Sequence, residues 1–521
     1  MNRSSSLKQL KSVPGFDLCI IGGGATGLGI AVDAASRGMK TILLEKDDFA
    51  KGTSSRSTKL VHGGVRYLQQ GNIKLVMEAL RERGLLRKNA PHLVKNQSFV
   101  IPNYKWWENP FYGVGLKMYD WMAGSLGLGP SEFLSVEETL ARAPTLDPEG
   151  LRGGVLYHDG QFDDARLAIH LAMTADELGA ILINHMAVTK LIHENKKVIG
   201  VIVRDEFSPA KEEMEIRAKC VVNATGVFTD SILNMDEPGA EPIISPSQGI
   251  HLVFDREFLA SDTAIMIPRT DDGRVLFAVP WHNKIIVGTT DTPVEKVSDE
   301  PIALPEEVDF VLEHIRRYLS KDPLREDIRS VFAGLRPLIK GNAKSTAALS
   351  RDHHISISDS ELITIAGGKW TTYRKMAEDV VDIAMHKAGV TEKECVTRQL
   401  RIHGYQEDID LHVHGYYYGT DAEKIATIIK EDVTLGETIH PSLPYTFAEI
   451  VWAVREEMCM TLEDALSRRT RALLLDAKAA IEAAPKVVRV MSKELSLDKT
   501  WETEQLAAFK DISRNYSVDT L

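Results

Sequence analysis

The order of apolar and polar residues is most regular near the N-terminus. Residues 16–22 (FDLCIIG) form a short apolar run of strand-forming residues that ends in a glycine cluster. A helical stretch from Ala25 to about Arg37 follows, and Gly38 closes it in the C-terminal position that glycine favours. Residues 39–46 (MKTILLEK) form a second apolar run. The pattern predicts one βαβ unit, which opens an α/β domain.

Two later segments repeat the order of strand, glycine turn and helix. They cover residues 219–233 and 362–384. The sequence between them is rich in strand-forming residues and includes a predicted hairpin over residues 274–290, with His282 and Asn283 at its turn. The α/β domain is therefore expected to be built from separate pieces of the chain.

The last part of the chain, from about residue 390, has the pattern of helices and loops. Thr446 and Glu449 form a capping-box signature ahead of an apolar run. Residues 465–491 form a strong helical run that Pro485 is predicted to break. A further helix is predicted to start at Pro305, because proline is common at the first helical position.

Composition narrows the class of protein. A chain of 521 residues is too long for one ordinary core, so two or three domains are expected. The net charge is −12 and no lysine- and arginine-rich run stands out, which excludes duplex nucleic acid as a partner. The four cysteines lack the spacing of a metal site or a disulfide framework, so we expect no metal and a reducing compartment. They are Cys19, Cys220, Cys395 and Cys459.

The first seventeen residues are polar and lack the apolar centre of a signal peptide. No stretch approaches the roughly 20 apolar residues of a membrane-spanning helix. We therefore expect a cytoplasmic protein that either stays in solution or lies peripherally on the cytoplasmic membrane. Residues 105–124 are dense in Trp, Tyr and Phe beside lysines, a mixture that suits a headgroup interface and a domain core equally.

A dinucleotide fingerprint follows the first predicted strand. Residues 22–27 satisfy G-x-G-x-x-G, with Gly22 for the tight turn, Gly24 for close approach of a pyrophosphate and Gly27 for close packing of helix on strand. Glu45 at the end of the next strand is placed to accept hydrogen bonds from a ribose. The context of strand, helix and acidic residue makes this a nucleotide site.

Three further segments favour FAD over NAD. Residues 48–66 form a loop of hydroxyls and glycines that can wrap a diphosphate and a flavin ring, whereas NAD enzymes usually continue into another βα unit. Residues 223–226 and 367–372 give two more close approaches of backbone to a long cofactor. The helix predicted to start at Thr371 or Thr372 could direct its positive end to a reduced ring.

The predicted fold is α/β, with a Rossmann-like FAD-binding domain in discontinuous segments, an interleaved β-rich substrate domain and an all-helical C-terminal domain. The expected boundaries are residues 15–95, 150–240 and 331–388 for the FAD-binding domain, 96–149 and 241–330 for the substrate domain, and 389–521 for the helical cap.

Two long motifs, TSSRSTKLVHGGVRYL (53–68) and GGKWTTYRKMAE (367–378), resemble the signatures of the FAD-dependent, aerobic glycerol-3-phosphate dehydrogenases. VVNATG, IIVGTTDTP and AGLRPL lie between them in the order of that family, and LSRRTRALLLDAK (466–478) resembles its helical cap. The resemblance covers nearly the whole chain.

The resemblance implies a reaction and its partners. Members of the family oxidise sn-glycerol 3-phosphate to dihydroxyacetone phosphate and pass two electrons through FAD to a quinone at the membrane. A related branch, the glycerol-3-phosphate oxidases, gives the electrons to dioxygen and makes hydrogen peroxide. The candidate protein partner is a second copy of the chain, in a homodimer.

The resemblance also implies site residues. The catalytic candidates are His62, His251, Arg336 and Lys369. The substrate-binding candidates are Arg66, Tyr67, Arg336 and Lys369. The cofactor-binding candidates are Gly22, Gly24, Gly27, Glu45, Thr53, Ser54, Ser57, His62, Gly63, Val188, Ala224, Gly226, Gly334, Gly368, Lys369 and Thr371.

The chemistry accounts for these residue types. A dianionic phosphate needs fixed cations, and the planar fork of an arginine matches its oxygens. A neutral histidine is the natural base for the hydroxyl proton near neutral pH, and His62 is preferred over His251. The competing interpretations are a buried structural ion pair for Arg336 and a helix-entry role for Lys369.

Three rival functions stay open at this point. One is the oxidase branch, although the chain has no obvious long insertion. Another is an amine or amino-acid oxidase of the same fold, which would need one arginine for a carboxylate rather than several cations for a phosphate. The third is a flavin-binding protein without turnover, which the concentration of acid–base and anion-binding residues disfavours.

Overall fold

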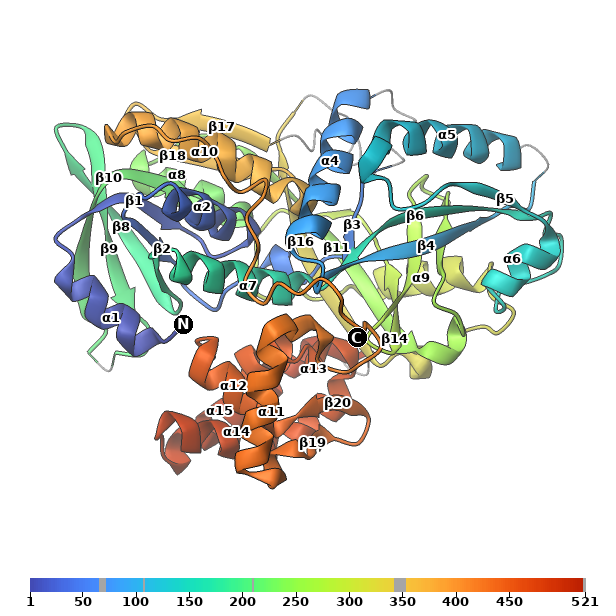
Figure 1. The fold of residues 1–521 in the computed structure, drawn as a ribbon. Coiled ribbons are helices and arrows are strands. Elements are labelled where there is room, and N and C mark those ends of the chain that lie inside the picture. The colour runs from blue at the N-terminus through green and yellow to red at the C-terminus, as the bar shows by residue number, and fades with distance from the viewer. Residues whose placement is uncertain (65–71, 106–107, 209, 342–352, 519–521) are drawn as a thin grey trace.

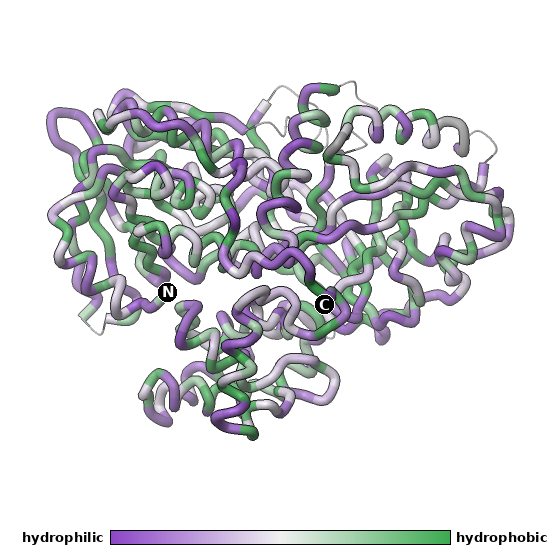
Figure 2. The backbone as a smooth tube through the Cα atoms, viewed as in Figure 1, coloured by the Kyte–Doolittle hydropathy of each residue, from purple (hydrophilic) through white to green (hydrophobic). Residues whose placement is uncertain are grey.

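The computed structural model describes residues 1–64, 72–105, 108–208, 210–341 and 353–518. Two large sheets lie side by side and a mainly helical C-terminal part lies below them (Figure 1). Hydrophobic and hydrophilic stretches alternate along the backbone, both in the two sheets and in the C-terminal part (Figure 2).

The first sheet is parallel at its centre. Its strand order is β17-β18-β10-β1-β2-β7, in which β18 to β7 pair in parallel and β17 is antiparallel to β18. The predicted βαβ unit is its middle. The strands are β1 (Phe16–Ile21), β2 (Thr41–Leu44), β7 (Ile181–Ile183), β10 (Glu213–Asn223), β17 (His353–Ile357) and β18 (Ile363–Gly367).

Alternate residues of these strands face two different layers, as the two-residue repeat of a strand requires. Leu18 and Ile20 pack against the helices α2 (Ala25–Ser36), α7 (Asp164–Glu177) and α10 (Tyr373–Ala388). Cys19 and Ile21 pack against the other layer. That layer consists of α1 (Arg3–Ser12), α8 (Thr229–Asp236) and the antiparallel strands β8 (Met186–Glu194) and β9 (Lys197–Asp205).

The second sheet is mostly antiparallel and has the order β15-β11-β14-β13-β12-β4-β6-β3, with β16 paired to β11 and β5 to β6. Its strands are β3 (Leu60–Val61), β4 (Val94–Pro102), β5 (Glu132–Leu134), β6 (Gly154–Phe162), β11 (Ile244–Asp255), β12 (Ala264–Ile267), β13 (Leu276–Trp281), β14 (Lys284–Gly288), β15 (Thr292–Pro293) and β16 (Ser330–Ile339).

The second sheet is covered on both faces. One face packs on α6 (Val136–Arg142) and on α9 (Pro305–Arg316), which starts at the predicted proline. The other face packs on α5 (Glu108–Ala123), and α4 (Ile73–Asn89) lies next to α5. The predicted hairpin is β13–β14, and His282 and Asn283 take the positive φ values of 45° and 58° that its turn requires.

The separate pieces of chain that were predicted therefore meet in one molecule, and the fold is the mixed α/β FAD-binding fold with a C-terminal helical domain. Strands β3, β6 and β16 lie largely within the boundaries expected for the FAD-binding domain, and they pair within the second sheet. The domain boundaries themselves stay a prediction.

The C-terminal part contains α11 (Ala422–Glu431), α12 (Phe447–Glu456), α13 (Ala472–Leu475), α14 (Ala477–Leu495) and α15 (Lys499–Ser513). At the start of α12, Glu449 Oε1 accepts a hydrogen bond from the backbone N of Thr446 at 3.0 Å, which is one half of the predicted capping box. A short hairpin of β19 (Thr438–His440) and β20 (Leu443–Thr446) is added to the expected helices. Its apolar residues join one continuous core with α2, α7 and α10.

The prediction that Pro485 breaks a helix is wrong. Helix α14 runs through Pro485 without interruption, and the interruptions lie earlier, at Arg471 (φ +58°) and at Asp476. Pro485 and Ile481 lie on the exposed side of α14, so the carbonyl that loses its proline partner can bind water.

Within the described ranges, no helix combines the length and the apolar character needed to cross a membrane.

Candidate active site

The first cavity lies where the central parallel strands end. The carboxyl ends of β1, β2, β10 and β18 meet at one edge of the sheet, where α/β folds bind their ligands. A cavity of about 380 Å³ opens there, and we call it the cofactor cavity. Its walls include Gly22 after β1, Glu45 after β2, Ala224 after β10 and Gly367 at the end of β18.

Two glycines of the fingerprint are required by close backbone approaches. Gly22 has φ +109°, and a Cβ there would lie 2.7 Å from the carbonyl oxygen of Ala224. A Cβ on Gly27 would lie 1.9 Å from the carbonyl oxygen of Gly22, so the third glycine lets α2 pack on the turn, as predicted. Gly27 is therefore a packing residue behind the cavity and not part of its wall.

Polar groups face this cavity from the N-terminus of α2 and from β2. Ser54 Oγ accepts a hydrogen bond from the Ala25 backbone N at 2.9 Å, which holds the loop after β2 against the helix. Glu45 accepts hydrogen bonds from the backbone N of Gly23 at 2.6 Å and of Asp47 at 2.9 Å. Burial raises the pKa of Glu45.

A second cavity of about 310 Å³ lies between the two sheets, and we call it the substrate cavity. It contains His62, His251 and Arg336 in its walls. Thr53, Pro337 and the segment Gly367–Trp370 line both cavities. The two cavities are therefore parts of one elongated site, with Lys369 at the junction.

Hydrogen bonds join the two signature motifs at this junction. Trp370 Nε1 donates to the carbonyl oxygen of Ser54 at 2.8 Å, and the backbone N of His62 donates to Thr371 Oγ1 at 3.3 Å. Thr53 Oγ1 donates to the carbonyl oxygen of Leu335 on β16 at 2.6 Å. The loop after β2 is thus fixed from two sides.

His251 lies on β11 with 3% of its surface exposed. Its Nε2 is 2.8 Å from Thr58 Oγ1, and its ring stacks on Phe332 with centroids 4.8 Å apart. Burial holds the pKa of His251 well below its usual range, and the charges of Lys59 and Arg336 add to the effect. The imidazole is therefore neutral near neutral pH.

Arg336 lies on β16, and its guanidinium is held in place by the segment between β14 and β15. Nη2 donates to Thr289 Oγ1 at 3.0 Å and to the carbonyl oxygen of Thr290 at 2.8 Å, and Nη1 lies 3.4 Å from Asp291 Oδ1. Gly249 makes room for it, because a Cβ there would lie 2.3 Å from Arg336 Nη2. A fifth of the side chain stays exposed toward the cavity.

A buried ion pair fixes the hydroxyl-rich loop. Lys59 Nζ lies 2.8 Å from both carboxylate oxygens of Asp164 and donates to the carbonyl oxygen of Ser55 at 2.6 Å. Ser57 Oγ donates to the same carboxylate at 2.7 Å. Both charged side chains are fully buried, and burial lowers the pKa of Lys59 and raises the pKa of Asp164.

Asp163, the residue before Asp164, binds side chains from two other parts of the fold. Asp163 accepts hydrogen bonds from His282 Nε2, at the hairpin turn of the second sheet, at 2.9 Å, and lies 3.0 Å from Arg471 Nε of the C-terminal part. Although burial opposes it, the charge of Arg471 and the hydrogen bond from His282 together lower the pKa of Asp163, whereas burial lowers the pKa of His282 to about 4.

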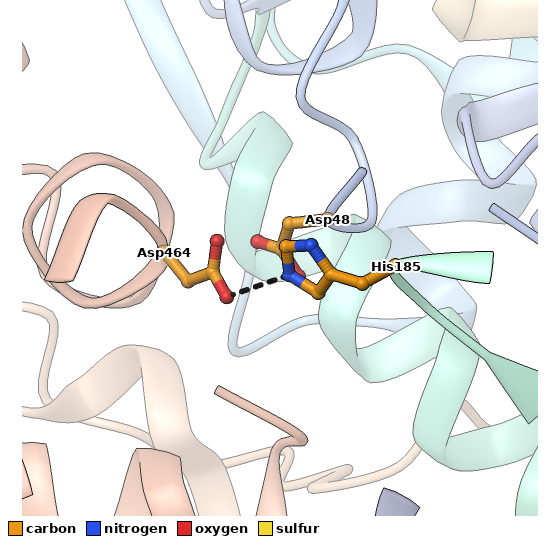
Figure 3. Close-up of side chains that lie close together, drawn as sticks. All are labelled: Asp48, His185 and Asp464. Carbon is orange, nitrogen blue, oxygen red and sulfur yellow. Dashed lines mark hydrogen bonds and ion pairs between the residues drawn. The ribbon is translucent and has the colours of Figure 1, made fainter. Parts of the chain in front are cut away.

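Asp48, His185 and Asp464 lie close together, with possible metal-ligand atoms all within 4.8 Å of one another (Figure 3). Their groups are already used by salt bridges. Asp48 binds Arg469 at 2.7 Å and Arg468 at 2.6 Å, and Asp464 binds His185 at 3.1 Å. Although burial opposes it, Asp464 raises the pKa of His185. Three cationic side chains around two carboxylates favour a structural junction over a metal site.

The structure places most predicted residues at the two cavities. Those in the walls are Gly22, Gly24, Glu45, Thr53, Ser54, Ser57, His62, Val188, Ala224, Gly226, His251, Gly334, Arg336, Gly368, Lys369 and Thr371. Gly27 and Gly63 lie behind the walls. Arg66 and Tyr67 lie outside the described residues.

Several residues of the site were missed by sequence reasoning. Thr58 contacts His251, Thr289 and Asp291 hold Arg336, and Lys59 pairs with Asp164. The polar run Thr289–Asp291 directly after a predicted strand was a usable signal. The partners of Lys59 and Thr58 lie about a hundred residues or more along the chain, so no local pattern could identify them.

The residues present fit FAD. The N-terminus of α2 and the glycine turn can receive a pyrophosphate, and Glu45 lies at the wall where a ribose would bind. A backbone without side chains at Gly22 and Gly24 leaves room for a close approach. The hydroxyl-rich loop and the segment 367–371 line the junction of the two cavities, where a ring system would meet a substrate.

Family models match most of the chain. Residues 17–374 match the model described as FAD dependent oxidoreductase, and residues 358–502 match the C-terminal domain of alpha-glycerophosphate oxidase. Relatives named glycerol-3-phosphate dehydrogenase, mitochondrial, include the protein of Mus musculus, which is 40% identical over 97% of this chain and 74% of the relative. A probable enzyme of that name from Caenorhabditis elegans is 43% identical over the same shares.

Solved structures agree with this similarity. The glycerol-3-phosphate dehydrogenase from Bacillus halodurans, complexed with FAD, has a TM-score of 0.78 and 30% identity and covers 100% of this chain and 98% of its own. The L-alpha-glycerophosphate oxidase from Mycoplasma pneumoniae, with FAD bound, has a TM-score of 0.57 and 17% identity and covers 74% of this chain and 97% of its own, which shows a shared fold.

Replacing Gly22 by alanine is expected to abolish retention of the flavin, because the methyl group would meet the backbone of Ala224 at a positive φ. Gly52→Ala is the matched control, since Gly52 lines the same cavity, has φ −76°, and a Cβ there meets nothing within 4 Å. The ratio of visible flavin absorbance to protein absorbance after purification measures the effect. Equal flavin content in both variants would contradict the assignment.

Proposed function

Because the chain belongs to the family of FAD-dependent glycerol-3-phosphate dehydrogenases, we propose that it oxidises sn-glycerol 3-phosphate to dihydroxyacetone phosphate and delivers the electrons to a quinone. The supporting observation is the wall Gly367–Trp370 that the cofactor and substrate cavities share. This shared wall places the histidines and cations of the substrate cavity next to the cofactor cavity. When bound, FAD supplies the hydride acceptor, which no amino-acid side chain provides.

Arg336 and Lys369 are proposed to bind the phosphate of the substrate. Both line the substrate cavity, and Arg336 is fixed by Thr289 and Thr290, so little further ordering is needed when an anion binds. A fixed arginine recognises phosphate oxygens through its planar fork. The predicted contributions of Arg66 and Tyr67 belong to the same proposal.

His62 is proposed as the base that takes the hydroxyl proton. It lies where β3 ends, at the wall of the substrate cavity, and its backbone is fixed by Thr371. The enclosed environment of His251 opposes a charged imidazolium, which a base must become. We propose that His251 stays neutral and helps to orient the substrate through its Nε2 and Thr58.

Anaerobic mixing of the purified flavoprotein with glycerol 3-phosphate tests the proposed function. Prompt bleaching of the visible flavin absorbance, followed in air by slow reoxidation with little peroxide, is the expected result. Fast stoichiometric peroxide would assign the protein to the oxidases, a name that the C-terminal family model carries. Absence of bleaching with glycerol 3-phosphate would contradict the substrate, and bleaching with amino acids instead would indicate an amino-acid oxidase.

Changing His62 to glutamine is expected to lower kcat by about 10²–10⁴-fold, because the base for the hydroxyl proton is lost. His386→Gln is the control, since that histidine is 84% exposed on α10. Steady-state kinetics with a water-soluble quinone analogue measures the effect. A larger loss of kcat in His251→Gln than in His62→Gln would reassign the base to His251.

A lipid-soluble acceptor requires contact with a membrane, and we propose that an apolar face of α4 and α5 makes it. Val114, Met118 and Trp121 follow one face of α5 at helical spacing and are 70%, 45% and 81% exposed. Ile73 and Met77 of α4 are about half exposed. The exposed Lys74, Lys105 and Lys117 could contact anionic headgroups. We propose that this face contacts the cytoplasmic side of the membrane.

A double variant, Met118→Glu with Trp121→Glu, is expected to remove the protein from vesicles of phosphatidylcholine and phosphatidylglycerol, because two charges would replace apolar contact. Co-sedimentation measures the bound fraction, and activity with a water-soluble quinone analogue should be kept. Val433→Glu, at an apolar side chain that is 77% exposed on the C-terminal part, is the control. Equal binding of all three proteins would contradict this surface.

A further inference from the structure

The chain leaves the second sheet at His62, and a hydrogen bond from outside the sheet fixes the next residue. β3 pairs with β6 only through Leu60 and Val61. Directly after His62, the backbone N of Gly63 donates to Tyr119 Oη at 2.8 Å. Tyr119 belongs to α5, the helix that covers this face of the sheet (Figure 1). The candidate base is therefore attached to a helix that carries none of the predicted catalytic residues.

A buried carboxylate accepts the proton of the Tyr119 hydroxyl and leaves the oxygen free to accept from the Gly63 amide. Tyr119 Oη donates its proton to Asp159 Oδ2 at 2.8 Å, so its lone pair is available to Gly63. Asp159 Oδ1 accepts from Arg83 Nη1 of α4 at 2.7 Å. Asp159 lies on β6 in the wall of the substrate cavity. Burial, with Asp159 beside it, raises the pKa of Tyr119 well above its usual value, so the hydroxyl keeps its proton.

The close approach also requires a glycine. A Cβ on Gly63 would lie 2.5 Å from Tyr119 Oη and 2.6 Å from Leu80 Cδ2. Tyr119 is 1% exposed and packs in an apolar cluster with Val76, Leu80 and Ala123. Burying a hydroxyl in such surroundings costs free energy unless both its donor and its acceptor function are hydrogen-bonded. The positions of Gly63 and Asp159 around Tyr119 are therefore narrowly defined.

We infer that Tyr119 is a positioning residue, which holds the Gly63 amide and thereby the imidazole of His62 in the geometry needed for proton removal. The inference rests on the proposed function, since it assigns a support for the base of that reaction. It accounts for Gly63, which lies behind the cavity wall and not in it. It also connects the proposed catalytic loop to the helix whose outer face is apolar.

Tyr119→Phe in the full-length flavoprotein tests the inference. It removes the acceptor of the Gly63 amide and leaves the ring in place. We expect kcat to fall about 10–100-fold, as a small misplacement of a reacting group costs, with flavin content unchanged and KM within a few-fold. Tyr104→Phe is the control, because it also loses a hydroxyl hydrogen bond, but to the carbonyl oxygen of Asp147 at 2.8 Å and not to the segment that carries His62.

A double-mutant cycle with His62→Gln separates positioning from a general loss of stability. If Tyr119 acts through His62, Tyr119→Phe should lower kcat little further in a His62→Gln background. Additive losses, or a wild-type kcat in Tyr119→Phe, would overturn the inference while leaving the proposed function intact. A wild-type flavoprotein that glycerol 3-phosphate does not reduce would overturn both.

A second variant covers the case in which Tyr119→Phe does not fold. Gly63→Ala places a methyl group against Tyr119 Oη and should lower kcat by a similar factor. Full activity in that variant would overturn the inference as well.

Discussion

The buried ion pair between Lys59 and Asp164 is the constraint on which the rest of the site depends. A charge without a partner could not stay in that interior, so the pair forces the loop after β2 to meet the start of α7. The loop then delivers Thr53 and Ser54 to the cofactor cavity and Thr58 and His62 to the substrate cavity. One electrostatic contact thereby sets the position of both halves of the site.

The neighbouring carboxylate, Asp163, makes further buried polar contacts that join distant parts of the chain. Asp163 binds the hairpin turn of the second sheet and Arg471 of the C-terminal part, while Asp164 binds the cofactor loop. Two successive acidic residues at the start of one helix therefore connect three regions. The salt bridges of Asp48 with Arg468 and Arg469 form a second connection to the C-terminal part. The C-terminal part is thus attached to the rest of the fold by buried salt bridges.

Local signals in the sequence predicted the elements and many of the site residues. The turn at Gly22 and the helix after it follow from neighbours within about thirty residues, and both were predicted correctly. Glu45 lines the cofactor cavity, and its contact with a ribose stays a prediction. The family resemblance nominated His251 and Arg336, and the structure puts both in one cavity. Tyr119, Thr58 and Lys59 were not found because their partners are distant in sequence and meet only through tertiary packing. Pro485 was misjudged because its effect depends on which side of the helix faces water.

The shared wall of the two cavities has a consequence for biosynthesis. Ser54 and Trp370, which hydrogen-bond at that wall, are 316 positions apart in the chain. A ribosome that adds about 5–20 residues per second has to translate for tens of seconds between them. During that interval the glycine turn and the hydroxyl loop exist without the segment that closes over them. The complete wall around the flavin site is therefore formed late in the synthesis of the chain.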